Sequence, residues 1–160
     1  MERVNRILRH PLWRGSLTQI EELEKDRIYC GHDLDHMLHV ARLSYIESLE
    51  RGLDISRETI YAAALLHDIG RGLEYKEGIP HEDAACAMAE TILPECGFCR
   101  EETERIVAAI SAHRSGGKEQ EGLSGILYRA DKASRNCYFC KAADRGCNWS
   151  FSKRNHDIKR

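Results

Sequence analysis

The sequence predicts an all-α protein, a single domain built as a bundle of five core helices with extra helices at its N-terminus. Apolar residues recur at helical spacing through most of the chain, and no segment has the alternating pattern of a β-strand. With 160 residues, the chain can bury one sizeable core without disulfides. We therefore expect a single helical domain.

Composition narrows the class of protein. Hydrophobic residues at 42% and charged residues at 31% are typical of a soluble globular protein, and a net charge of -2 argues against stable nucleic-acid binding. The N-terminus has no apolar leader, and no segment approaches about 18 consecutive apolar residues. We expect a cytoplasmic protein with no membrane contact and reduced cysteines, and the sequence leaves a homodimer open.

Two helices are predicted before the core. A short first helix ends before Pro11, and Ser16 with Gln19 has the form of a capping box that starts a second helix. These helices make up an N-terminal arm, residues 1–29, that packs on a core formed by residues 30–135. Residues 136–160 are predicted to be a cysteine-containing tail of the same domain.

The core helices are predicted from breaks in the apolar pattern. The third helix follows Gly31, and Ser56 can cap the fourth, which carries the run AAALLHDIG. Gly70 and Gly72 are expected to end that helix, with a loop over residues 73–80. A fifth helix then starts at the next histidine, and two more follow.

Five of these helices place His or Asp where an apolar residue is due. A buried imidazole or carboxylate costs free energy unless hydrogen bonds or a metal ion compensate for lost hydration. Four imidazoles and two carboxylates suit iron, manganese, zinc or cobalt better than calcium or magnesium, and they can hold two ions. Asp68 is the natural bridge between them. The predicted metal ligands are His36, His67, Asp68, His81, His113 and Asp131.

The ordered pattern H…HD…H…H…D, with HDIG at residues 67–70, resembles the HD-domain superfamily of metal-dependent phosphohydrolases. By position, His36, His67, Asp68 and Asp131 are similar to the four-residue ligand set of that family, and His81 and His113 to its additional dinuclear pair. The runs AISAHRSGG and LYRADKASR are most similar to small bacterial dinucleoside-polyphosphate hydrolases. That resemblance implies a di-iron enzyme acting on nucleotides.

Cations beyond the metals are needed to bind a phosphorylated substrate. Four basic residues closely follow proposed ligands and are candidates for phosphate binding: Arg71, Arg114, Lys132 and Arg135. We assign catalytic roles to Asp68, Lys132 and Arg71. His32 is predicted to orient His36 or to lie in the helix cap, and His39 either to support a ligand without contacting the metal or to lie on the surface.

Two CxxC pairs raise the question of a separate zinc or iron–sulfur site. Cys96 and Cys99 fill a turn inside the core, where apolar residues would serve equally well. The better candidates for a separate metal are Cys137, Cys140 and Cys147, although ordinary thiols are the favoured interpretation.

The sequence as a whole predicts hydrolysis of a phosphoester or phosphoanhydride in a small nucleotide-like substrate, by a hydroxide that bridges two metal ions. The alternatives are a di-iron oxygenase with nearly the same ligands and a noncatalytic regulator that binds metal or nucleotide. Ligand spacing alone does not separate these chemistries.

Overall fold

The fold is described from a computed structural model, which describes residues 1–114, 120–142, 145, 147 and 154–158. In these parts of the chain every regular element is helical and no strand forms, which confirms the predicted all-α class. Their helices are all too short or too polar to cross a membrane. The helices are α1 (Glu2–Arg9), α2 (Pro11–Glu24), α3 (Leu34–Glu50), α4 (Arg57–Leu66), α5 (Arg71–Glu77), α6 (His81–Glu95), α7 (Arg100–Ala112), α8 (Gly122–Ala133) and the 3-10 helix η1 (Cys137–Phe139).

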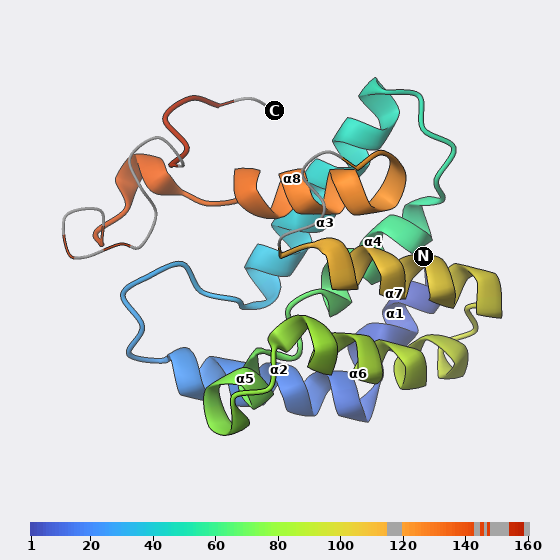
Figure 1. Ribbon diagram of the computed structural model, residues 1–160, viewed down its shortest axis with the longest axis horizontal. Coiled ribbons are helices and arrows are strands. Elements are labelled where there is room, and N and C mark those ends of the chain that lie inside the picture. The colour runs from blue at the N-terminus through green and yellow to red at the C-terminus, as the bar shows by residue number, and fades with distance from the viewer. Residues whose placement is uncertain (115–119, 143–144, 146, 148–153, 159–160) are drawn as a thin grey trace.

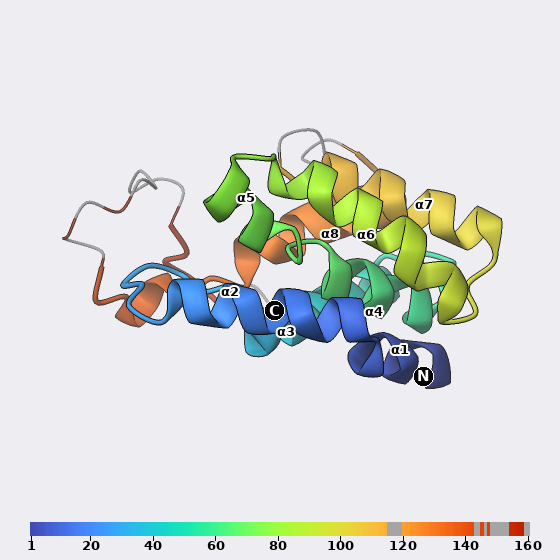
Figure 2. The same cartoon turned by 90° about the horizontal axis from the view of Figure 1, so that it is seen from below.

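Helix α4 lies at the centre of the bundle and contacts α1, α3, α7 and α8 (Figure 1). Helix α3 packs against α8, and α6 packs against α7. The view in Figure 2 shows α1 and α2 along one side of the molecule, where α2 contacts α5 and α6. The ends of α3, α4, α6, α7 and α8 that carry the proposed ligands can therefore meet at one place.

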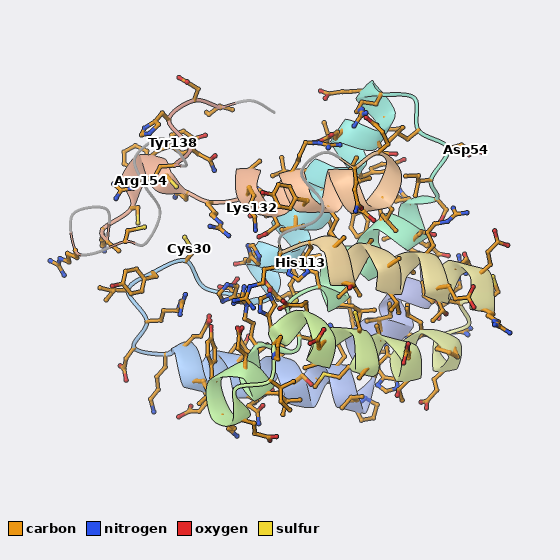
Figure 3. The ribbon with its side chains drawn as sticks, viewed as in Figure 1. Cys30, Asp54, His113, Lys132, Tyr138 and Arg154 are labelled. Carbon is orange, nitrogen blue, oxygen red and sulfur yellow. The ribbon has the colours of Figure 1, made fainter. Side chains whose placement is uncertain are left out.

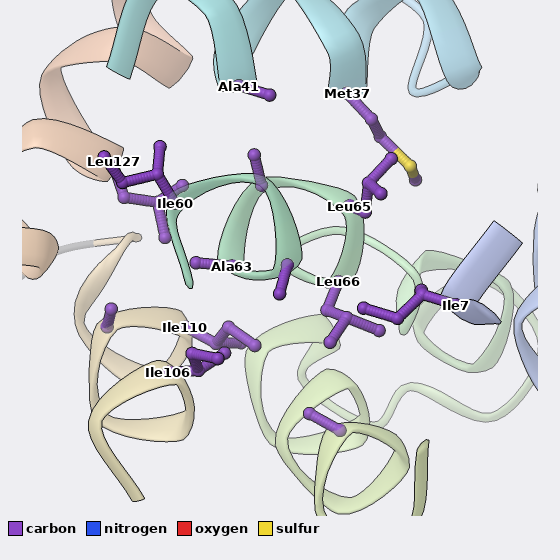
Figure 4. Close-up of a cluster of buried hydrophobic side chains, with 14 of the residues drawn as sticks. Ile7, Met37, Ala41, Ile60, Ala63, Leu65, Leu66, Ile106, Ile110 and Leu127 are labelled. Carbon is purple, nitrogen blue, oxygen red and sulfur yellow. The ribbon is translucent and has the colours of Figure 1, made fainter. Parts of the chain in front are cut away.

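The core around α4 is tightly packed. Residues Ala62, Ala63 and Ala64 are completely buried, and their small side chains let neighbouring helices approach closely. Figure 4 shows larger side chains from the surrounding helices, such as Met37 and Ile110, directed toward α4. Burial of this apolar surface stabilises the bundle and fixes the end of α4 in position.

The boundary predicted for the second helix was wrong. Helix α2 begins at Pro11, because proline is favoured in the first turn and the His10 imidazole accepts a hydrogen bond from the Leu12 amide at 3.2 Å. Ser16 does not cap a helix start. Its hydroxyl donates to the Leu12 carbonyl at 2.9 Å from inside the helix.

The loop predicted for residues 73–80 was also wrong, because α5 spans Arg71–Glu77. Gly70 is the residue immediately before this helix rather than a terminator. Gly78, with φ of 73°, ends α5 in the left-handed conformation that glycine adopts without strain. Arg71 and Glu74 also form an ion pair across one turn at 3.1 Å, which supports the short helix.

Trp13 fastens the N-terminal helices to α4. Its indole N–H donates to the Leu65 carbonyl at 2.8 Å, and the side chain is 3% exposed. We expect Trp13→Phe to lower the free energy of unfolding by about 1–3 kcal/mol, because the buried carbonyl loses its donor. Urea denaturation measures this change, with Leu12→Ala on the exposed face of α2 as the control. Equal stability of Trp13→Phe and the wild type would contradict this account.

Candidate metal centre

The six residues predicted as metal ligands come together in the structure. His36 lies in α3, and the pair His67 and Asp68 comes directly after the last residue of α4. His81 is the first residue of α6, His113 follows the last residue of α7, and Asp131 lies in α8. They form two groups that share Asp68, and within each group the ligand atoms lie within 4.8 Å of one another: His36, His67, Asp68 and Asp131, and Asp68, His81 and His113. Figure 3 shows the second group's His113 in the middle of the molecule, among other nitrogen-bearing side chains.

The two oxygens of Asp68 face different histidines. Oδ2 lies 3.0 Å from Nε2 of His67 and 3.5 Å from Nε2 of His36. Oδ1 lies 3.4 Å from Nε2 of His81 and 3.7 Å from Nε2 of His113. Asp131 joins the first group, with its Oδ1 3.7 Å from Nε2 of His36. One carboxylate therefore connects two sets of nitrogen ligands.

The protonation state of His67 leaves a bare nitrogen in the site. Its Nδ1 lies 2.7 Å from the Ala64 carbonyl oxygen, so Nδ1 carries the proton and donates it. Burial lowers the pKa of His67, which keeps the imidazole neutral at neutral pH. Its buried Nε2 then has no hydrogen-bond partner and faces an Asp68 oxygen that is also an acceptor. A cation between the two would relieve this repulsion.

The other histidines are also held through their second nitrogen. Nδ1 of His113 lies 2.5 Å from the Ile110 carbonyl, and Nδ1 of His81 lies 3.0 Å from Glu74 Oε2. The Ser134 hydroxyl lies 3.3 Å from Nδ1 of His36. An imidazole that binds a metal through one nitrogen usually donates from the other in this way, which fixes its tautomer and orientation.

This donor set fits divalent transition metals. It combines imidazole nitrogens with carboxylate oxygens, the ligand types that such metals prefer. Two of the imidazoles, those of His36 and His67, have a buried Nε2 atom with no hydrogen-bond partner. Each of these side chains lies in a packed helix or at its end. Nε2 of His81 also lies 3.1 Å from Nε2 of His113, a distance at which a proton on either nitrogen makes a hydrogen bond and a metal ion could take the place of that proton. The donor set does not distinguish iron from manganese, zinc or cobalt.

Basic side chains balance the two carboxylates. Burial opposes ionisation of Asp68, but the charge that His67 carries when protonated and the charge of Arg71 hold the pKa of Asp68 well below the usual range. Because His67 is neutral at neutral pH, Arg71 is the permanent cation here, with Nε 2.9 Å from Asp68 Oδ1. Burial also opposes ionisation of Asp131, yet the charge of Lys132 in particular lowers its pKa to about 2.

A Glu–His pair beside the centre was not predicted from the sequence. Nδ1 of His32 lies 2.6 Å from Glu24 Oε1, and its Nε2 lies 3.9 Å from Asp68 Oδ2. The Tyr75 hydroxyl donates to the same Glu24 oxygen at 2.5 Å. Asp33, not His32, caps α3. Glu24 is the last residue of α2, Tyr75 lies in α5, and His32 lies in the loop before α3, so no local sequence pattern connects the three.

A cavity of about 210 Å³ opens beside His36 and Asp131. Arg71 and Arg135, two of the four residues predicted to bind phosphate, line it, and so does Arg27, which was not among those predicted. The other two predicted phosphate ligands lie elsewhere among the described residues. Arg114 pairs with Glu74 and Glu82, each at 3.1 Å, and Lys132 Nζ lies 2.5 Å from Asp131 Oδ2. His39 lines a separate cavity of about 430 Å³ under the tail.

Comparisons with known proteins find a matching family model and similar sequences. Residues 33–144 match the family model of the HD domain. The chain is 40% identical over 158 residues to an uncharacterized protein of Clostridium beijerinckii, covering 99% of each. It is 30% identical over 105 residues to ribonuclease Y of Clostridium perfringens, covering 66% of this chain but only 18% of that protein.

A solved structure has a similar fold. The crystal structure of a predicted HD superfamily hydrolase from an uncultured Thermotogales bacterium aligns with a TM-score of 0.63, covering 88% of this chain and 80% of that chain. At 24% sequence identity, this likeness concerns the fold alone.

Proposed function

The chain belongs to the HD domain family, and from this premise we propose that it is a metal-dependent phosphohydrolase with two divalent ions. In this proposal His36, His67, Asp68 and Asp131 hold one ion, and Asp68, His81 and His113 hold the other. The domain core would span residues 30–135, with the arm and the tail packed against it. HD domains bind divalent metals, and the His and Asp groups in this chain have the composition to do so.

The observation that carries the proposal is the position of Asp68 between two imidazole groups. When bound, two adjacent divalent ions lower the pKa of a water and neutralise charge on phosphoryl oxygens. Arg71, 2.9 Å from Asp68 Oδ1, is placed to orient that carboxylate and to offer its remaining N–H groups to a phosphate. Lys132 would hold Asp131 in position and assist the leaving group.

The cavity supports an anionic substrate. Arg27, Arg71 and Arg135 line it. A guanidinium group can donate two parallel hydrogen bonds to the oxygens of one phosphate. Ribonuclease Y, to which the chain is similar over a small part of that protein, carries a name that indicates phosphodiester cleavage. We propose a small nucleotide-like substrate with several phosphates, and we place dinucleoside polyphosphates first because of the motif resemblance. Iron is the proposed native metal.

The experiment combines metal analysis with a substrate panel. Protein purified without added metal is expected to contain close to two transition-metal ions per chain, with iron predominant under anaerobic purification. Dinucleoside polyphosphates, mononucleotides, a short RNA and a chromogenic phosphodiester would be tested with Fe²⁺, Mn²⁺, Zn²⁺ or Co²⁺. We expect phosphate-bond hydrolysis without oxygen, abolished by a chelator and restored by metal. His39→Gln, outside both ligand groups, is the matched control and should retain activity.

Other outcomes would identify the alternative functions. Oxygen consumption with an organic substrate, together with no hydrolysis in any arm, would contradict the proposal and favour a di-iron oxygenase. Tight nucleotide binding without turnover, measured calorimetrically on fully metal-loaded protein, would favour a regulator.

A further inference from the structure

Four cysteines from two distant segments gather at the rim of the proposed metal centre. Cys30 lies on the loop between α2 and α3, and Cys137, Cys140 and Cys147 lie in the C-terminal tail. Figure 3 shows Cys30 on the side of the molecule where the tail lies. Cys30, Cys140 and Cys147 line the same cavity, and none of the four cysteines forms a disulfide.

Other contacts also join this loop to the tail. The Tyr29 hydroxyl donates to the Arg145 carbonyl at 3.4 Å. In the sequence, Tyr29 precedes Cys30, and Arg145 lies between Cys140 and Cys147. Further along, the Asn155 amide donates to the Lys132 and Arg135 carbonyls at 3.0 and 2.8 Å, which holds the tail against the end of α8. The packing of the fold, rather than nearness in sequence, thus brings Cys30 to the other three.

We propose that Cys30, Cys137, Cys140 and Cys147 bind a structural zinc ion that fastens the C-terminal tail to the α2–α3 loop. Four cysteines in tetrahedral arrangement are a common structural zinc site, and Cys137-x-x-Cys140 has the spacing usual for a pair of its ligands. The second CxxC pair, Cys96 and Cys99, has no such surroundings. Cys96 is buried in the apolar core and Cys99 is exposed at the start of α7.

Without a metal ion, the surroundings of Cys30 favour its protonated thiol. Burial raises the pKa of the Cys30 thiol, and the three tail cysteines raise it as well, because neighbouring thiolates repel one another. Zinc removes that repulsion, since it binds the thiolate form and releases the protons. The Arg135 guanidinium lowers the pKa of Cys30 and would stabilise the excess negative charge of a zinc ion bound by four thiolates.

Zinc binding would also shape the cavity next to the His and Asp ligands. The ligand atoms of each proposed His and Asp group (together the HD centre) lie within 4.8 Å of one another. Among the described residues, no three cysteine sulfurs are that close together. Zn–S bonds of about 2.3 Å would therefore draw the tail toward the loop. Because Arg71, Arg135 and His36 line the same cavity, the tail would become a fixed wall of the substrate site.

Cobalt substitution tests the zinc site separately from the HD centre. Thiolate ligands give Co²⁺ a near-ultraviolet charge-transfer band, whereas the nitrogen and oxygen ligands of the HD centre give none. Reduced, metal-free protein titrated with Co²⁺ is expected to develop this band with the intensity of one thiolate-bound Co²⁺ per chain, within the three equivalents that the cysteines and the HD centre together would bind. The band should be lost when Zn²⁺ is added. Cys30→Ser and Cys140→Ser should each reduce the band at least several-fold, and the matched variant Cys99→Ser should leave it unchanged. Asp68→Ala should also keep it.

Three results would overturn the zinc site. The first is no thiolate band in wild-type protein that is folded by circular dichroism. The second is an unchanged band in Cys30→Ser. The third is acid-labile sulfide in the purified protein, with iron bound at these cysteines. Limited proteolysis provides a second readout. Zinc is expected to slow cleavage in the tail of the wild type but not of Cys140→Ser, and equal cleavage with and without zinc would count against a fastening role.

Discussion

Replacing Asp68 with alanine is expected to abolish metal loading and phosphohydrolase activity together. Asp68 is the residue shared by both proposed ligand groups, and each of its oxygens lies within 4 Å of imidazole nitrogens from two proposed ligands. Its removal would leave each remaining group short of a ligand and would leave Arg71 with Glu74 as its remaining carboxylate partner. The loss of activity should exceed the roughly 10- to 100-fold typical of a residue that only orients a ligand.

A second substitution at the same position separates metal loss from unfolding. Asp68→Asn keeps the size of the side chain and one oxygen for Arg71, but it lacks the negative charge that two cations share. We expect Asp68→Asn to fold normally by circular dichroism and to bind far less metal than the wild type. Asp54→Asn, which lies far from His113 in Figure 3, is the control and should be fully loaded. Normal metal content and turnover in Asp68→Ala would eliminate the proposed site.

The cluster of His and Asp side chains could be predicted because each member interrupts an apolar helical pattern. Ile106, Ala109 and Ile110 define the buried face of α7, and His113 continues that face by one more step. The same reasoning placed His36 and Asp131 in the interior. Periodicity reports which face of a helix is buried, so it identifies polar residues on that face even though it does not report their distances.

The partners of the ligands could not be predicted in the same way. Glu24 reaches His32 from α2, and Glu74 reaches His81 from a helix that had been predicted as a loop. Arg27 joins the cavity because the α2–α3 loop folds toward the tail. These contacts join segments whose relative placement depends on the whole bundle, and an exposed charge on one helix carries no local sign of the residue it will meet.

The HDIG glycine shows the same limit of sequence reasoning. A glycine after an apolar run favours a helix end, and Gly70 and Gly72 were both interpreted as terminators. The structure gives them another reason to be glycine, namely close packing. A Cβ added at Gly70 would lie 2.2 Å from the His81 carbonyl oxygen and 2.7 Å from the Ala85 amide. The φ of Gly70 is an ordinary -77°, so contact with α6, not backbone conformation, excludes a side chain there.

Gly70→Ala is therefore expected to damage both the fold and the second half of the metal centre. The added methyl group meets backbone atoms of α6, which cannot rotate away, so α6 must shift at its first residue, the ligand His81. We expect a loss of about 3 kcal/mol in the free energy of unfolding, at the upper end of the usual cost of overpacking. At temperatures where the variant stays folded, its metal content should fall from about two ions toward one.

Two other glycines provide matched controls for Gly70→Ala, because they differ in what an added Cβ would meet. At Gly72 it would lie 2.2 Å from the Gln19 Oε1 atom, the end of a flexible side chain that can rotate away, so Gly72→Ala should cost less. At Gly15, in the exposed middle of α2, no atom lies within 4 Å, and Gly15→Ala should add about 0.5–1 kcal/mol through helix propensity. Urea denaturation and metal analysis of the three variants would test this order. If Gly70→Ala kept full stability and two metals, contact with α6 could not be what positions His81.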